Sequence, residues 1–252
     1  MSEREVFNLL LSGFAALALV IMVVLFRMTA PYGRHARPGW GPTLPSRWAW
    51  VLMEFFAPVG MAVMFAIGGR FDIVSVAFLL VWELHYCQRA FVFPFLMRAE
   101  GRRMPVLIAL FGAMFNVFNV WLNGRWLFAL SDPYPATWLT DPRFLCGLAV
   151  FLFGFVVNLH SDHVLRTLRQ PNETGYKIPQ RGMFKFVSAA NYFGELMEWI
   201  GWALLTWSWP GAVFAFWTFA NLGPRALATH RWYKKTFDSY PADRKALIPF
   251  VF

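Results

Sequence analysis

The chain has 252 residues, of which 58% are hydrophobic and only 15% are charged, a balance too apolar for a soluble globular domain. Its net charge of +9 would indicate nucleic-acid binding in a soluble protein, whereas in a membrane protein an excess of Lys and Arg reports topology. We therefore expect a polytopic all-α membrane protein with the lipid bilayer, and no nucleic acid, as its partner.

Hydrophobic length predicts seven membrane-spanning helices, because a span needs roughly 17 to 25 mostly apolar residues. The first segment has full membrane length and lacks a small-residue cleavage site, so we interpret it as a retained helix and not as a signal peptide. The last two are less regular, and Gly223 and Pro224 interrupt the seventh near its end. The predicted spans are 6–26, 48–67, 73–96, 105–122, 142 to about 159, about 191–207 and 211–227.

The distribution of positive charge predicts the orientation of these spans. With seven spans the termini lie on opposite sides, and most of the 23 Lys and Arg fall on one set of alternate connections. The opposite side carries only Arg4, Arg70, Arg125 and Arg143. Because positive residues face the cytoplasm, we expect an outside or lumenal N-terminus and a cytoplasmic C-terminus.

Many ionisable and amide side chains lie within the predicted spans. Such a group costs several kcal/mol in lipid unless it is paired or faces a cavity, so each is a functional candidate. On the sixth span, Asn191, Glu195 and Glu198 share one face with Gly194 and Gly201, which predicts that this face points into the bundle. The candidates are Glu54, Glu83, His85, Tyr86, Gln88, Arg89, Asn116, Asn119, Asn158, Asn191, Glu195 and Glu198.

Glu54 and Tyr86 are predicted to lie at a common depth. At about 1.5 Å per residue, both fall roughly 10 to 14 Å below the cytoplasmic boundary, so they are expected to meet across one cavity. Alternatively, Glu54, Glu83 and Arg89 are polar groups that are paired between helices and have only a structural role. We interpret Asn116 and Asn119 as interhelical hydrogen-bonding residues with no part in the chemistry.

No common nucleotide or metal motif is present. The sequence lacks GxGxxG and GxxxxGK, the lone HxxH at His160 and His163 is too little for a histidine-box enzyme, and Cys87 and Cys146 lack zinc spacing, so we expect no metal. The connection after the fifth span mixes cations with aromatic and amide groups. This favours a phosphate-bearing cofactor, although an ordinary positive-inside loop would also explain the charges. The residues are Asp162, Arg166, Arg169, Asn172, Tyr176, Lys177 and Arg181.

Longer motifs follow in order towards the C-terminus. They are Asn158 to Asp162 (NLHSD), Tyr176 to Gln180 (YKIPQ), Val187 to Asn191 (VSAAN), Glu198 to Gly201 (EWIG) and Arg244 to Phe250 (RKALIPF). With these motifs the sequence resembles the steroid 5α-reductase family (3-oxo-5-alpha-steroid 4-dehydrogenase), and the type 2 enzyme has the nearest pattern. The resemblance thins towards the N-terminus but includes Glu54, His85, Tyr86 and Arg89.

The resemblance implies a seven-helix membrane reductase that uses NADPH to saturate the carbon 4–5 double bond of a 3-oxo-Δ4 steroid such as testosterone or progesterone. It implies one domain, with substrate-side helices over about 1–143 and an NADPH-binding part over about 144–252. We take a monomer as the default, in the endoplasmic reticulum membrane if the source is a eukaryote and in the cytoplasmic membrane if it is a bacterium.

The family roles carry over residue by residue. Glu54 and Tyr86 are expected at the steroid carbonyl, where Tyr86 donates to the oxygen, and Glu54 either orients Tyr86 or, when protonated, donates as well. Arg89 and His230 are plausible additions to the site. The residues expected to bind NADPH are Asn158, Asp162, Arg169, Tyr176, Asn191, Glu195, Arg225, Tyr233 and Arg244.

Three departures from the family pattern leave the identity of the steroid open. Met53 replaces a glutamine, Phe111 replaces an arginine, and Thr229 interrupts a histidine run.

Three other functions are alternatives to steroid reduction. They are a reductase of unsaturated acyl or polyprenyl chains, an isoprenylcysteine methyltransferase, and a transporter, although the inverted repeats typical of transporters are not found.

Overall fold

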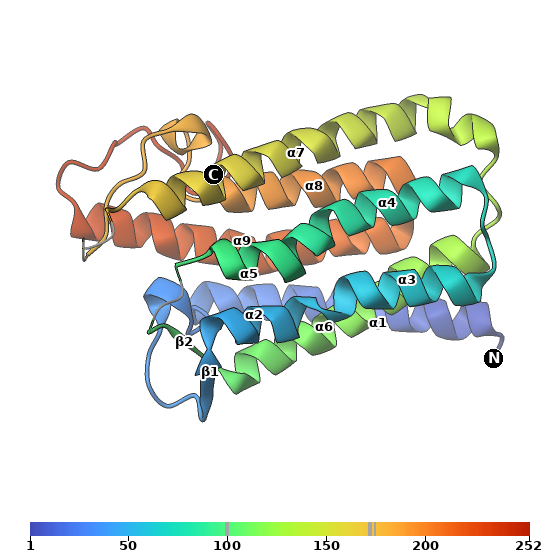
Figure 1. Cartoon of the computed structure of the whole chain (residues 1–252), viewed down its shortest axis with the longest axis horizontal. Helices are drawn as coiled ribbons and strands as arrows, with labels where there is room; N and C mark the ends of the chain where they lie inside the picture. The colour runs from blue at the N-terminus through green and yellow to red at the C-terminus, as the bar shows by residue number, and fades with distance from the viewer. Residues whose placement is uncertain (99–100, 171–172, 174) are drawn as a thin grey trace. The chain divides into compact units, whose positions relative to one another are not determined.

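The computed structural model describes residues 1–98, 101–170, 173 and 175–252 (Figure 1). The chain divides into two compact units. The first comprises Met1–Ser12 and Ala30–Phe144, and the second comprises Gly13–Thr29 and Leu145–Phe252. The boundaries fall within α1 (Glu3–Arg27) and near the start of α7 (Pro142–Thr167), so both helices contribute to each unit.

The first unit is built from helices that are interrupted or end in a π-helical turn. In it α6 packs against α2 and α3, and α4 packs against α3. Its helices are α2 (Ser46–Glu54), α3 (Phe56–Gly68), α4 (Ile73–Cys87), α5 (Phe93–Leu96) and α6 (Val106–Arg125), with π-helical turns at Gln88–Val92 and Trp126–Leu130 and 3-10 turns at Gly33–His35 and Ala136–Thr140.

Two prolines account for the irregular backbone in this unit. Proline has no amide hydrogen, so it cannot bond to the carbonyl four residues before it in a helix. Pro58 removes the bond to Glu54, where α2 ends, and Pro94 removes the bond to Ala90, inside the π-helical turn that follows α4. Glu54 and Tyr86 therefore both lie next to a helix irregularity, a setting common at functional sites.

A short antiparallel sheet departs from the all-α expectation. β1 (Thr43–Pro45) pairs with β2 (Arg103–Pro105), and Arg103 holds the pair by donating from Nε to Thr43 Oγ1 at 2.7 Å. Each strand is a three-residue connection directly before a helix. A segment this short carries no alternating pattern, so the sequence could not reveal it.

The second unit contains α7, α8 (Ala190–Thr206), α9 (Trp209–Thr236) and a 3-10 turn at Gly182–Lys185. α8 packs along α9. α9 continues through Gly223 and Pro224 to Thr236, beyond the predicted end of the seventh span. Residues 222–226 are all buried, and we attribute the tolerance of this proline to packing that compensates for one missing backbone bond.

Glycines bring the backbones of α7 and α8 into direct contact. A Cβ added at Gly154 would lie 2.5 Å from Glu198 N and 2.6 Å from Gly194 O, and one at Gly194 would lie 2.5 Å from Asn158 N. Gly147 and Gly201 face each other in the same way one heptad further along. Small residues of this kind allow helices to approach closely in a membrane, and here they hold Asn158 beside α8.

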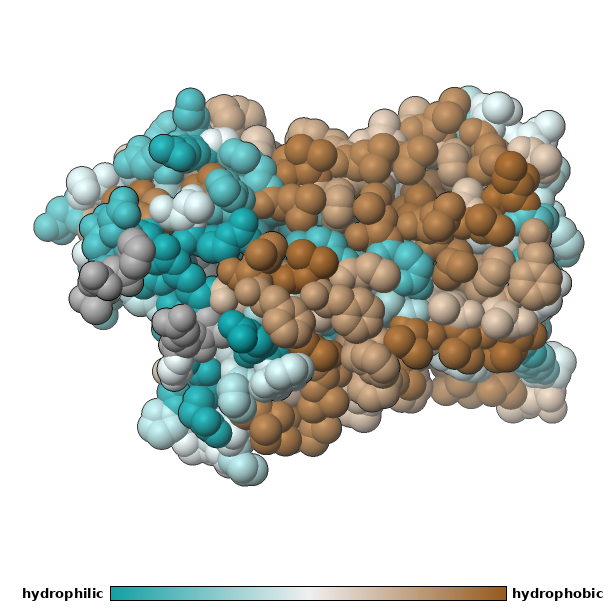
Figure 2. Space-filling view, in the orientation of Figure 1, coloured by the Kyte–Doolittle hydropathy of each residue, from teal (hydrophilic) through white to brown (hydrophobic). Residues whose placement is uncertain are grey.

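Five helices in the described part of the chain are long and apolar enough to cross a membrane. They are Glu3–Arg27, Ser46–Gly68, Ile73–Leu96, Val106–Leu130 and Pro142–Thr167, in agreement with the first five predicted spans. α8 and α9 form helices over the sixth and seventh predicted spans but are not among the five, so the seven-span topology stays a prediction. Figure 2 shows hydrophobic residues over the helices, and hydrophilic residues beside β1 and β2 and beside the C-terminal end of α9.

The four cations predicted on the non-cytoplasmic side all have partners within the first unit. Arg4 lies 5.5 Å from the centre of the Trp126 ring, and Arg125 NH2 lies 2.6 Å from Glu3 Oε1. Arg70 donates to the carbonyl oxygens of Leu127, Ala129 and Ser131 and to Ser131 Oγ.

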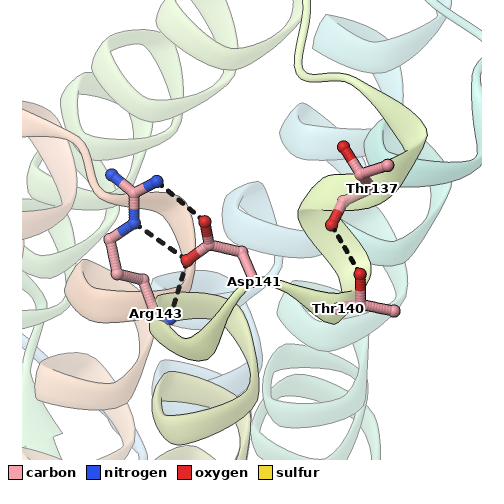
Figure 3. Close-up of polar contacts among 4 residues, drawn as sticks. All are labelled: Thr137, Thr140, Asp141 and Arg143. Atoms are coloured by element: carbon pink, nitrogen blue, oxygen red, sulfur yellow. Dashed lines mark hydrogen bonds and ion pairs between the residues drawn. The ribbon is translucent and has the colours of Figure 1, made fainter.

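Arg143 contacts Asp141 at the start of α7 through Nε, at 2.9 Å, and NH2, at 2.8 Å (Figure 3). The side-chain hydrogen bond from Arg143, assisted by its backbone N–H, lowers the pKa of Asp141 to about 2. The positive charge of Arg143 is therefore locally balanced.

Candidate functional site

Glu54, Tyr86 and Asn116 form one hydrogen-bonded cluster in the first unit. Asn116 Nδ2 donates to Glu54 Oε2 at 3.2 Å and to the Met53 carbonyl oxygen at 2.8 Å, while its Oδ1 accepts a long bond from Tyr86 OH at 3.5 Å. Glu54 comes from the end of α2, Tyr86 from α4 and Asn116 from α6. Asn116 does bridge helices as expected, but the groups that it bridges are the two proposed to act on the substrate.

The surroundings hold Tyr86 in place. Its side chain is buried, and its ring packs 4.8 Å from that of Trp82 and 4.9 Å from that of His85. Trp82 Nε1 donates to the Ala57 carbonyl oxygen at 3.1 Å, which links α4 to α3 just after the break at Glu54. Tyr86 is thus fixed by aromatic packing, and the contact of its hydroxyl with Asn116 is long and therefore weak.

Two further charged residues, Glu83 and Arg89, belong to α4 and its π-helical turn. The guanidinium of Arg89 lies 5.0 Å from the ring centre of Trp50 and 4.5 Å from that of Phe93. Glu83 Oε2 accepts from the Cys87 thiol at 3.2 Å. Aromatic rings therefore surround Arg89 in a geometry that favours cation–π attraction.

In the second unit, Asn158, Asp162 and Asn191 come together beside the glycine contact of α7 and α8. Asn158 Nδ2 donates to the Asn191 carbonyl oxygen at 3.0 Å, and Asn191 Nδ2 donates to Asp162 Oδ1 at 3.3 Å. Glu195 lies half-buried one turn further along α8, and Glu198 is fully buried. The polar face of α8 is therefore turned inward within this unit, although Phe193 and Leu196 on its other face are buried too.

A second group of residues connects α9 to α8 and to the segment that follows α9. Arg225 is buried and donates from Nε to Tyr192 OH at 2.9 Å. The Tyr233 ring stacks on Tyr240 at 5.2 Å, and Arg244 lies 5.0 Å from the Tyr240 ring centre while donating to the Pro179 carbonyl oxygen at 3.0 Å. Arg244 Nε is buried and has no hydrogen-bond partner within the described residues.

Ser188 lies at the centre of a hydroxyl network that the sequence analysis missed. Ser188 Oγ is 2.6 Å from His230 Nδ1, 2.5 Å from Tyr240 OH and 3.1 Å from the Lys245 carbonyl oxygen. Burial lowers the pKa of His230 to about 4, with help from Lys234, Arg244 and Lys245, so the imidazole is neutral at pH 7. Burial also raises the pKa of Tyr240.

The loop residues Arg169 and Tyr176 lie together and are more open to solvent. Arg169 NH1 donates to the Gly175 carbonyl oxygen at 2.8 Å, and its guanidinium is 5.8 Å from the Tyr176 ring centre. Tyr176 in turn packs edge-on against Trp232 of α9 at 4.9 Å. Asn172, another polar residue of this loop, lies outside the described residues.

The predicted site residues thus fall into local groups. The two expected at the carbonyl are joined through Asn116, and those expected to bind the cofactor form three groups in the second unit. Tyr192, Ser188 and Tyr240 were not predicted as site residues. Ser188 belongs to the quoted motif VSAAN, but nothing in its distance along the chain from Tyr240 indicated that the two are partners.

Comparison with known proteins assigns the family. A model of the family 3-oxo-5-alpha-steroid 4-dehydrogenase matches residues 102–252. The 3-oxo-5-alpha-steroid 4-dehydrogenase 1 of Bos taurus is 42% identical over 100% of this chain and 99% of its own length. Steroid 5-alpha-reductase DET2 of Gossypium hirsutum is 42% identical over the same shares of both chains. The chain belongs to the steroid 5α-reductase family.

As a steroid 5α-reductase family member, the protein is an oxidoreductase that acts on a carbon–carbon double bond. The 3-oxo-5-alpha-steroid 4-dehydrogenase 2 of Homo sapiens is also 42% identical, over 96% of each chain. The human type 1 enzyme is 45% identical over 88% of this chain, so the identities do not favour the type 2 enzyme, whose pattern the motifs resembled. The family assignment expected from the motifs is confirmed.

Proposed function

We propose that this protein reduces the carbon 4–5 double bond of a 3-oxo-Δ4 steroid, with NADPH as the reductant. The observation that carries the proposal is the cluster of half-buried Glu54 with buried Asn116 and Tyr86, which gives a hydroxyl donor a supporting carboxylate and amide between three helices. Family membership supports the same chemistry, since the named relatives are steroid 5-alpha-reductases.

The residues of the second unit fit a phosphate-bearing cofactor. Arg225 and Arg244 are both buried, and Arg244 Nε is a buried donor without a hydrogen-bond partner in the described part of the chain, while NH1 donates to Pro179. Guanidinium groups match phosphate oxygens in geometry and charge. We infer that these two arginines, with Arg169, hold phosphates, and that Asn158, Asp162, Tyr176, Asn191, Glu195 and Tyr233 hold the remainder of the cofactor.

When bound, NADPH supplies the hydride that adds to the β-carbon of the enone. This addition moves negative charge onto the steroid carbonyl oxygen, and a donor aimed at that oxygen stabilises the transition state. Tyr86 OH is that donor, and it exchanges its long contact with Asn116 Oδ1 for the substrate oxygen. A solvent proton then completes the reduction at the α-carbon.

Glu54 and Asn116 position the donor. Asn116 donates to Glu54 Oε2 and to the Met53 carbonyl oxygen, which fixes the amide so that its Oδ1 faces Tyr86. The second carboxyl oxygen of Glu54 orients Tyr86 or, when protonated, donates directly to the same carbonyl oxygen. Both roles require the carboxyl group to stay where Asn116 holds it.

We also propose seven spans, with the N-terminus outside or in the lumen and the C-terminus in the cytoplasm. The uneven distribution of Lys and Arg supports this orientation, because only Arg4, Arg70, Arg125 and Arg143 fall on the side opposite the cytoplasm. The relatives named above come from eukaryotes, and we infer an endoplasmic reticulum membrane by analogy, with a monomer as the functional form.

The test is an assay of the purified full chain in nanodiscs with NADPH and either testosterone or progesterone. We expect NADPH consumption to match the formation of a product heavier by two hydrogen atoms. Tyr86→Phe serves as the control, because it removes the donor and keeps the ring packing. Consumption of NADPH with a polyprenyl or acyl enone but with no steroid would replace the proposed substrate class.

A further inference from the structure

A small surface of apolar and cationic side chains, the C-terminal patch, lies outside the proposed site. It consists of Phe186, Phe250 and Val251 with Lys185 and Lys245. Phe250 and Val251 are 80% and 76% exposed, and the Phe186 ring lies 5.7 Å from the Phe250 ring. Such large exposed apolar side chains, flanked by cations, need an apolar partner.

Backbone pairing holds the patch in place. Lys245 N donates to Phe186 O at 2.9 Å, Ser188 N donates to Lys245 O at 2.8 Å, and Ala189 N donates to Ala246 O at 3.2 Å. Val187 and Leu247 are fully buried, whereas Lys185, Phe186 and Lys245 are exposed. The paired segments therefore have an inner side in the core of the second unit and an outer side that forms the patch.

The turn that carries Phe250 is closed and strained. Val251 N donates to Ile248 O at 3.2 Å, and Phe252 N donates to the same oxygen at 3.0 Å. Phe250 adopts φ 64°, a left-handed conformation that costs free energy for a bulky residue. The Phe252 ring packs inward, 6.4 Å from the Phe219 ring of α9, whereas Phe250 is exposed. The strained backbone conformation at Phe250 therefore accompanies a side chain that faces outward.

We infer that the C-terminal patch inserts into the headgroup region of the lipid bilayer and binds anionic headgroups. Phe219 belongs to the predicted seventh span, so its contact with Phe252 places the turn against a helix that is expected to cross the membrane. Lys185 and Lys245 form no ion pair in the described part of the chain, and their charge complements anionic lipid.

A second protein is the less suitable occupant. A stable protein interface buries about 800 Å² on each partner, and three apolar side chains are too few to form the core of one. Apolar residues beside lysines are instead typical of interfacial anchors, where rings enter the headgroup layer and ammonium groups remain at its surface. The inference does not depend on the proposed reaction or on which side of the membrane is cytoplasmic.

The test is a spin label at Val251, introduced as Val251→Cys in a Cys87→Ser/Cys146→Ser chain in nanodiscs of phosphatidylcholine and phosphatidylserine. Labels at Val156, which is 64% exposed on the apolar part of α7, and at the exposed Asp238 serve as lipid and water references. We expect collisions with oxygen at Val251 to approach those at Val156, and collisions with a water-soluble nickel chelate to be several-fold rarer than at Asp238.

The lysines are tested by Lys185→Gln/Lys245→Gln and by nanodiscs of phosphatidylcholine alone. Each change should increase nickel collisions at Val251 several-fold, because the label moves outward. A Val251 label as accessible to nickel as that at Asp238 would place the patch in water, and protection from both reagents would show a protein cover. Either result overturns insertion, and insensitivity to lysine charge and lipid composition overturns the binding of anionic headgroups.

Discussion

The side-chain amide of Asn116 lies 3.2 Å from Oε2 of Glu54 and donates a hydrogen bond to it. The same amide accepts the long bond from Tyr86 OH, so a neutral side chain sets the distance between the proposed donor and its carboxylate. This arrangement makes position 116 as informative a test of the site as the two residues that it joins.

Asn116→Leu should lower kcat by about 10- to 100-fold, since leaving buried polar groups without their partner costs about 1–3 kcal/mol. Cofactor KM should change little. Steady-state kinetics in nanodiscs provides the measurement, and Asn119→Leu is the matched control one turn along α6, because Asn119 is buried but is not part of this cluster. Equal losses in the two variants would reduce Asn116 to a packing role.

Tyr86→Phe and Glu54→Gln should each lower kcat by about 10²- to 10³-fold, the usual cost of removing a group that stabilises a developing oxyanion. NADPH affinity should stay near that of the unaltered protein, because the residues proposed to bind it lie in the second unit. Titration of cofactor binding alongside turnover separates the two effects. Wild-type turnover in both purified variants would contradict the assignment.

His230 should make stability depend on pH below neutrality. Its pKa in the folded protein is about 4, compared with 6.5 for an unperturbed imidazole. As pH falls from about 6.5 to about 4, the unfolded chain takes up a proton that the folded chain refuses, so stability decreases over this window. His230→Gln should flatten that part of a plot of Tm against pH, whereas His163→Gln, at an exposed position, should leave it unchanged.

Gly154→Ala should destabilise the second unit by about 1–3 kcal/mol, because overpacking forces the backbone to move. The added Cβ would meet Glu198 N at 2.5 Å and Gly194 O at 2.6 Å. Gly13→Ala is the control, since nothing lies within 4 Å of its Cβ position in α1 and alanine is the better helix former. Thermal unfolding in one detergent compares them, and equal Tm values would contradict the close contact.

Apolar length was enough to predict the first five spans, since a long hydrophobic helix has few alternatives in a membrane. It could not predict where the helices break. Pro58 and Pro94 were visible, but their effect depends on neighbours that hold the freed carbonyls, as does the continuation of α9 through Pro224. The strand pair at Thr43 and Arg103 was missed because long-range pairing of two short connections has no local pattern.

The candidate site, too, was only partly predictable from the sequence. Residue type and motif resemblance selected Glu54 and Tyr86, and the structure joins them through Asn116. The sequence could not reveal Asn116 as the link, because an asparagine within a span has the same pattern whether it holds two helices together or positions a donor. Ser188 was missed for a related reason: its partners His230 and Tyr240 lie far along the chain.

The glycine contact between α7 and α8 also has a consequence for handling the protein. Where two helices meet backbone to backbone, no side chains stand between them for a detergent tail to replace, and acyl chains cannot wedge into the gap. Short-chain detergents that separate helices packed through leucines should therefore leave α7 and α8 paired. In such detergents the native packing should be lost first at other surfaces, where bulky side chains are expected to face lipid.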